Sequence, residues 1–156
     1  MKSAWVLLGE ANTRKSTTSR LLTGIDRWEG QVGVMDWQGK ERWMRSLVSA
    51  AQEAKRTPKE LLDELNGKNH WQGEFDTVRN AVLVLRYDAF NGCPDGKMYI
   101  HDFVNDGWVI QCVVSLGEPA RDWVRLSGFQ FLEIPNSASL PSNAVAAKVR
   151  TAFGWL

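Results

Sequence analysis

Residues 4–22, AWVLLGEANTRKSTTSRLL, contain the pattern that decides the fold. The continuous apolar run from Ala4 to Leu8 is typical of a strand that is buried on both faces of a sheet. A polar stretch then starts at Gly9, and the segment from Lys15 to Leu22 has the character of a helix that ends before Gly24. The sequence therefore predicts a strand, a loop and a helix in immediate succession.

Further apolar runs rich in β-branched residues recur along the chain, with helical stretches between them. They cover residues 32–35, 81–85, 108–114 and 129–134. Alternation of this kind is typical of a parallel sheet covered by helices. We expect one α/β domain over residues 1–156: a three-layer sandwich in which a mostly parallel five-stranded sheet carries helices on both faces.

Two of the expected helices have clear start signals, whereas one segment leaves two alternatives open. Thr57, three residues before Glu60, forms a capping box, and Asp95 can cap the helix that follows it. In residues 41–56 the apolar spacing favours a helix, but the turn formers in residues 36–40 could instead send the chain back as a strand. We expect a helix over residues 41–56.

Composition excludes several classes of protein. Basic and acidic side chains nearly cancel, at 19 against 18. Proteins that bind nucleic acid usually carry a basic excess, so the charge balance argues against that role. Cys93 and Cys112 form neither a metal-binding spacing nor a disulfide framework. The early apolar run is too short for a signal peptide, and no run approaches the length of a membrane span. We expect a cytoplasmic protein that makes no contact with a membrane.

Tryptophan is the one unusually frequent residue, with eight copies scattered along the chain. Large aromatic side chains serve both cores and interfaces. We expect most of them to pack in the core, and the alternatives are a surface for a protein partner or a shelf on which a base stacks. The eight are Trp5, Trp28, Trp37, Trp43, Trp71, Trp108, Trp123 and Trp155.

The loop after the first strand carries the most specific functional signal. The spacing from Gly9 to Lys15 and Ser16 is that of the Walker A loop, G-x-x-x-x-G-K-[ST]. Such a loop surrounds phosphates with backbone N–H groups, and the helix behind it directs its positive end at them. Lys15 would reach the β- and γ-phosphates as the main catalytic cation, and the hydroxyl of Ser16 would bind Mg²⁺. The expected cofactor-binding residues are Gly9, Glu10, Ala11, Asn12, Thr13, Arg14, Lys15, Ser16 and Thr17.

In these residues the chain resembles the P-loop NTPase superfamily. The specific likeness covers residues 1–24, and the remainder matches only in its alternation of strands and helices. The resemblance implies binding of ATP or GTP with Mg²⁺ and, in a small NTPase or kinase, hydrolysis or phosphoryl transfer. Arg14 departs from the family pattern, which has a glycine there. Its side chain could swing outward or add a positive charge to the bound nucleotide.

Further site residues are expected where strands end. Ligands of open α/β sheets lie outside the carboxyl ends of the strands. The resemblance implies a second metal-linked acid beside Ser16, for which Asp36 is the first choice and Asp88 the second. Arg86 and Arg121 are expected to stabilise the developing charge at the phosphates. For either aspartate, the alternative is a solvated loop residue.

Two later segments have functional alternatives that the resemblance suggests. Residues 117–125 lie where small P-loop kinases carry an arginine-bearing lid, and residues 135–143 where they form a base-binding loop. A plain surface helix and an ordinary turn are the respective alternatives. For the whole chain, two other functions stay open: a non-catalytic binding or interaction module with a degenerate loop, and a scaffold whose loop binds a phosphorylated partner.

Overall fold

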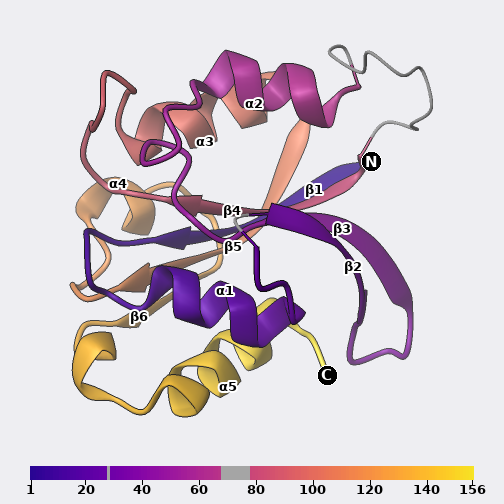
Figure 1. The fold of residues 1–156 in the computed structure, drawn as a ribbon, viewed down its shortest axis with the longest axis vertical. Coiled ribbons are helices and arrows are strands. Elements are labelled where there is room, and N and C mark those ends of the chain that lie inside the picture. Colours follow the sequence, from indigo (N-terminus) through magenta and orange to yellow (C-terminus); the bar gives the residue numbers. More distant parts are fainter. Residues whose placement is uncertain (28, 68–77) are drawn as a thin grey trace.

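The computed structural model describes residues 1–27, 29–67 and 78–156. Strands and helices alternate along most of the chain (Figure 1). In chain order they are β1 (Lys2–Leu8), α1 (Lys15–Thr23), β2 (Glu29–Met35), β3 (Glu41–Leu47), α2 (Pro58–Leu65), β4 (Asn80–Leu85), α3 (Gly96–Asn105), β5 (Trp108–Leu116), α4 (Asp122–Arg125), β6 (Phe131–Ile134), a 3₁₀ turn (Ser137–Ser139) and α5 (Ser142–Phe153).

One six-stranded sheet forms the middle layer, in the order β2-β3-β4-β1-β5-β6. Only β2 is antiparallel to its neighbour, and the other five strands run parallel. Helices α2 and α3 cover one face, and α1 and α5 cover the other (Figure 1). The predicted mostly parallel sheet with helices on both faces is therefore confirmed, with six strands instead of five. None of the helices in the described ranges has the length and apolar character needed to cross a bilayer.

Strand β1 lies in the middle of the core and fixes the position of the loop that follows it. From Ala4 to Leu8 every residue is at most 5% exposed, and β4 and β5 flank the strand in parallel register. After β1 the chain goes to β3 and β4 on one side, and α3 then carries it across to β5 on the other. The carboxyl end of β1 is therefore the point at which the strand order reverses, where open α/β sheets form ligand crevices.

The sixth strand arises from the segment for which we expected a helix. Residues 41–47 pair with β2 in a hairpin, so the helix predicted over residues 41–56 is wrong. The carboxylate of Asp36 accepts the N–H groups of Gln38 and Lys40, which stabilises the turn between the strands. Along β3 the side chains then alternate, with Trp43 65% exposed and Met44 2% exposed. This alternation follows the strand period of two residues, which the helical reading overlooked.

Both predicted helix caps are present. The Thr57 hydroxyl accepts the N–H of Glu60 at 3.2 Å, as a capping box requires. The Asp95 carboxylate accepts the N–H of Met98 at 2.9 Å at the start of α3. Because α3 is the crossover that returns the chain past β1, this cap stabilises the connection on which the strand order depends.

The tryptophans divide between core and surface. Trp5, Trp108 and Trp155 are each at most 5% exposed, as expected for core residues. Trp37 and Trp43 are 70% and 65% exposed, and both belong to the β2–β3 hairpin. The exposed pair therefore keeps the partner-surface alternative open. Trp28 and Trp71 lie outside the described residues.

Replacing the cap of α3 should destabilise the fold measurably. We expect Asp95→Ala to lower the free energy of unfolding by about 1 kcal/mol, because an N–H of the first helical turn loses its acceptor. Asp95→Asn keeps an acceptor oxygen and is the matched control. Urea denaturation followed by circular dichroism measures both variants, and equal losses in the two would show that the cap does not stabilise the helix.

Candidate functional site

The connection from β1 to α1 makes a tight loop at the carboxyl edge of the sheet. Asn12 and Arg14 have left-handed backbone conformations, with φ of 62° and 71°. The loop closes tightly onto Gly9: a Cβ there would lie 2.5 Å from the Thr13 hydroxyl and 2.7 Å from the Leu116 carbonyl oxygen. A larger residue than glycine would therefore force the loop and β5 apart.

Most backbone N–H groups of this loop lack partners within the described part of the chain. Residues 11 and 12 form a turn, the N–H groups of residues 10–12 and 14 donate no hydrogen bond there, and no side chain caps the start of α1. The Thr13 hydroxyl and the Lys15 amine both turn to the carbonyl oxygen of Glu10 instead. Unpaired N–H groups at a helix N-terminus, next to left-handed residues, form a concave site with affinity for anions.

Lys15 is the buried cation of the loop. The residue is 5% exposed, and its Nζ donates to the Glu10 carbonyl oxygen at 2.6 Å. Burial lowers the pKa of the Lys15 amine from that of an ordinary lysine, and the charge of Glu53 opposes the shift. An anionic ligand would compensate this poorly hydrated charge better than a carbonyl oxygen does.

The Glu10 carboxylate links the loop to the end of β4. Its Oε2 accepts from Nε and Nη2 of Arg86 at 3.2 Å and 3.0 Å, and its Oε1 accepts the N–H of Asp88 at 2.9 Å. The Arg86 guanidinium also lies over the Phe90 ring, 4.0 Å from its centre, and 3.8 Å from a Glu53 oxygen. Arg86 is thus close to the loop, but two carboxylates compensate its charge.

Asp88 and Arg121 form a second ion pair at the same edge. Nη1 of Arg121 lies 2.7 Å from one Asp88 oxygen and Nη2 lies 3.3 Å from the other, and these bonds lower the pKa of the Asp88 carboxyl. Nε of Arg121 donates to Glu118 at 2.6 Å, and the guanidinium lies over the Tyr87 ring. Because the Asp88 N–H binds Glu10, this pair joins the network around the loop. Residues 117–125 thereby contribute a fixed arginine and the short helix α4.

Arg14 points away from the space that the loop surrounds. Its Nε and Nη2 donate to the carbonyl oxygens of Ser137 and Ala138, and its Nη1 donates to the hydroxyl of Ser142, each at 3.0 Å. The Ser137 hydroxyl returns a bond of 2.8 Å to the carbonyl oxygen of Thr13. Of the two alternatives for this arginine, the outward one holds. The guanidinium binds the loop to residues 137–142.

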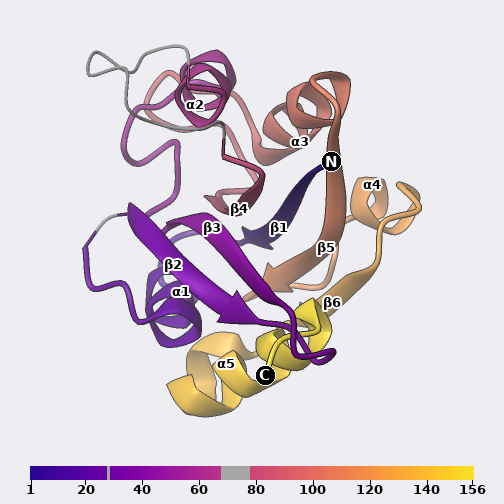
Figure 2. The ribbon, with the colours of Figure 1, turned by 90° about the vertical axis from the view of Figure 1, so that its right-hand side faces the viewer.

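Asp36 lies at the opposite end of the sheet from Lys15, so its predicted place beside Ser16 is wrong. The prediction treated β2 as a parallel strand, but β2 is antiparallel and ends beside the start of β3. Figure 2 shows that end near the C-terminus of the chain, and Asp36 pairs there with Trp155. Its carboxylate is used by the hairpin turn and by the Arg42 guanidinium.

Two residues near the loop escaped sequence reasoning. The fully buried Gln52 accepts the N–H of Arg86 at 3.0 Å and donates to the carbonyl oxygens of Arg86 and Pro94. Glu53 lies close enough to influence both Lys15 and Arg86 electrostatically. Both residues fall in the segment that was assigned to a helix, and an isolated glutamine carries no signal of burial. Correct recognition of the β2–β3 hairpin would have placed them after a parallel strand.

Among the described residues, the Ser16 hydroxyl is a candidate ligand for a metal ion, but no set of protein side chains would surround the ion. In the parts of the chain that the structure describes, no three His, Cys, Asp or Glu side chains converge on one point. Mg²⁺ that accompanies a nucleotide takes several ligands from phosphate and water, so such a set of side chains is not required. Ser16, in the first turn of α1 next to Lys15, fits the role of the hydroxyl ligand.

Comparison with known proteins identifies no relative. No protein-family model, no curated protein and no solved structure matches the chain. The function of the site is therefore inferred from its own residues.

Two substitutions at Arg14 separate its backbone strain from its side-chain bonds. Both Arg14→Ala and Arg14→Gly lose the three hydrogen bonds of the guanidinium. A single hydrogen bond to a charged group contributes about 1.5–3 kcal/mol to stability. Alanine also keeps the left-handed strain, which costs about 1–2 kcal/mol and which glycine relieves. We expect stability in the order wild type, Arg14→Gly, Arg14→Ala, measured by urea denaturation. An Arg14→Gly protein at least as stable as wild type would contradict the anchoring role.

Proposed function

We propose that this protein binds ATP or GTP together with Mg²⁺ through residues 9–17. The observation that carries the proposal is that the N–H groups of residues 10–12 and 14 have no partner among the described residues, in the same loop as the buried amine of Lys15. Support comes also from the position of the loop at the reversal of strand order, where ligands of open α/β sheets bind. Together these features supply positive potential and hydrogen-bond donors for a phosphate group.

Each residue of the loop has a definable role in this function. The N–H groups of residues 10–12 and 14 would donate to phosphate oxygens. Lys15 would exchange the Glu10 carbonyl for a phosphate oxygen and so recover a full ionic partner. Ser16 would hold Mg²⁺, which would neutralise part of the phosphate charge. Arg14 would keep the loop in shape from outside, through its bonds to residues 137–142.

Binding without turnover is supported better than catalysis. The acid expected beside Ser16, Asp36, lies at the far end of the sheet, and both oxygens of Asp88 already bind Arg121. Arg86 is likewise compensated by Glu10. These pairings would have to break before the arginines could stabilise a developing charge. A small NTPase or kinase is the second candidate, favoured by the placement of Arg86 and Arg121 in the network around the loop.

Nucleotide binding should stabilise the protein against heat. At 100 times its dissociation constant, ATP or GTP with Mg²⁺ should add about 2.7 kcal/mol to the free energy of unfolding. Lys15→Ala should abolish the shift in melting temperature, because the only buried cation of the loop is lost. Ser16→Ala should abolish only the part that depends on Mg²⁺.

The matched control for these variants is Lys148→Ala, which removes an exposed lysine on α5 and should shift with nucleotide as wild type does. Circular dichroism checks that all three variants are folded. If neither nucleotide stabilises the wild type at millimolar concentration, or if Lys15→Ala responds as wild type does, the proposed function is wrong.

Binding should also be linked to proton uptake at alkaline pH. The pKa of Lys15 is lowered in the free protein, and a bound phosphate would raise it again. Nucleotide affinity should therefore fall as the pH rises through that lowered pKa, and binding should take up protons in this range. Isothermal titration calorimetry in buffers of different ionisation enthalpy measures the uptake. Proton release, or the same uptake in Lys15→Ala, would assign the effect to another group.

A further inference from the structure

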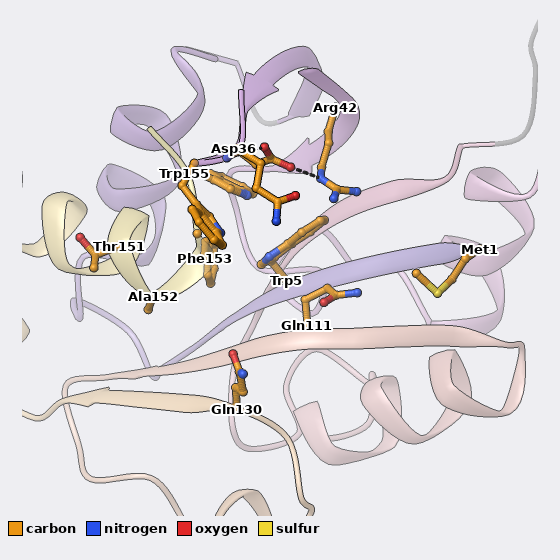
Figure 3. Close-up of a pocket in the computed structure, with 13 residues that line it drawn as sticks. Met1, Trp5, Asp36, Arg42, Gln111, Gln130, Thr151, Ala152, Phe153 and Trp155 are labelled. Atoms are coloured by element: carbon orange, nitrogen blue, oxygen red, sulfur yellow. Dashed lines mark hydrogen bonds and ion pairs between the residues drawn. The ribbon is translucent and has the colours of Figure 1, made fainter. Parts of the chain in front are cut away.

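A cavity lies at the amino end of the sheet, away from the loop of residues 9–17. It encloses 510 Å³ between the start of β1, the β2–β3 turn and the C-terminal residues 151–155 (Figure 3). A volume of this size suits a small molecule. Because the loop of residues 9–17 follows the opposite end of β1, a molecule bound here could not be the phosphate acceptor of a nucleotide bound there.

Aromatic side chains form one wall of this cavity. Trp5, Phe153 and Trp155 pack with ring centres 4.9–6.5 Å apart and with their planes tilted by 52–66°. These three rings are only 5–6% exposed, so they contact the cavity mainly at their edges, and no two of them are parallel as a slot for a flat base would require. Trp37, which is 70% exposed, stands at the rim.

Amide groups supply the polar side of the cavity. The side chains of Gln38 and Gln130 make no hydrogen bond to any described residue, and Gln111 uses only its Nε2, towards Ser3. Each glutamine can both donate and accept, which is also true of a hydroxyl group. The Nε1–H of Trp155 also lacks an acceptor among the described residues, but it is buried beneath the cavity surface.

The two charged side chains that line the cavity, Asp36 and Arg42, compensate each other. The Asp36 carboxylate is paired with Arg42 at 3.2 Å and accepts two backbone N–H groups, of which that of Lys40 does most to lower its pKa. It therefore stays ionised and compensated, and Arg42 retains two terminal nitrogens without a described partner. Because they compensate each other, these two side chains do not attract a phosphate, a carboxylate or an ammonium group to the cavity.

We propose that this cavity binds a neutral sugar of one or two rings. The hydroxyl groups of a sugar match glutamine amides that both donate and accept, and its C–H face suits the exposed ring of Trp37 at the rim. The free guanidinium nitrogens of Arg42 would donate to further hydroxyl groups. Binding at this end of the sheet is separate from nucleotide binding.

Nuclear magnetic resonance titration of the ¹⁵N-labelled protein tests this site. The probes are glucose, galactose, mannose, maltose and lactose, each added singly, with adenine as a flat neutral comparison. At least one sugar should shift the indole N–H signal of Trp155 and the side-chain amide signals of Gln111 and Gln130 saturably. Gln130→Ala should weaken that sugar about tenfold, which corresponds to one lost hydrogen bond.

Two further variants serve as controls. Trp43→Ala removes the other exposed tryptophan of the hairpin, which lies outside the cavity, and should bind the sugar as wild type does. Lys15→Ala should also bind it normally, so this proposal can hold even if nucleotide binding fails. The proposal is wrong if no sugar shifts these signals at millimolar concentration, if adenine binds more tightly than every sugar, or if Gln130→Ala leaves affinity unchanged.

Discussion

The burial of β1 between two parallel neighbours is the constraint on which the site depends. Every residue from Ala4 to Leu8 is enclosed, so the strand cannot shift without disrupting the core on both faces. Its carboxyl end, and with it Gly9, is held where the chain turns from one half of the sheet to the other. A loop of mostly polar residues thereby gains a fixed position, and its backbone donors can be aligned in advance of any ligand.

Around that loop, some side chains fix its conformation, and Lys15 supplies its positive charge. Arg14 and Ser137 bind it from the β6–α5 side, while Glu10 binds it to the end of β4 through Arg86. Lys15 remains the cation enclosed by the loop itself. This division accounts for an arginine at a position where a glycine would be expected: the backbone adopts the left-handed conformation, and three bonds of the guanidinium offset the strain.

Much of the fold could be predicted because the signals were local. The apolar run of β1, the cap at Thr57 and the cap at Asp95 each depend on a few adjacent residues, and all three are present in the structure. The β2–β3 hairpin was only the second alternative for residues 41–56, because Trp43 and Met44 fit a helical face as well as an alternating strand. That one error also misplaced Asp36, since the direction of β2 depends on the strand that pairs with it.

The network around Glu10 could not be read from the sequence for a different reason. The pairs Glu10–Arg86 and Asp88–Arg121 join residues far apart in the chain, and only the register of the sheet brings them together. Charged residues at strand ends indicated the edge of the sheet but not which charges would compensate one another. The choice between a binding function and a catalytic function depends on which charges are paired, so it required the three-dimensional structure.

The central claim is that the backbone N–H groups of residues 10–17 bind the phosphates of a nucleotide. Nuclear magnetic resonance of the ¹⁵N-labelled protein, titrated with MgATP and with MgGTP, reports on each of these groups separately. The account predicts that the largest shifts on saturation fall on the backbone amides of residues 10–17, with smaller ones at the residues that bind Arg14. Saturable binding that leaves these amides unmoved, or no shift with either nucleotide, would contradict it.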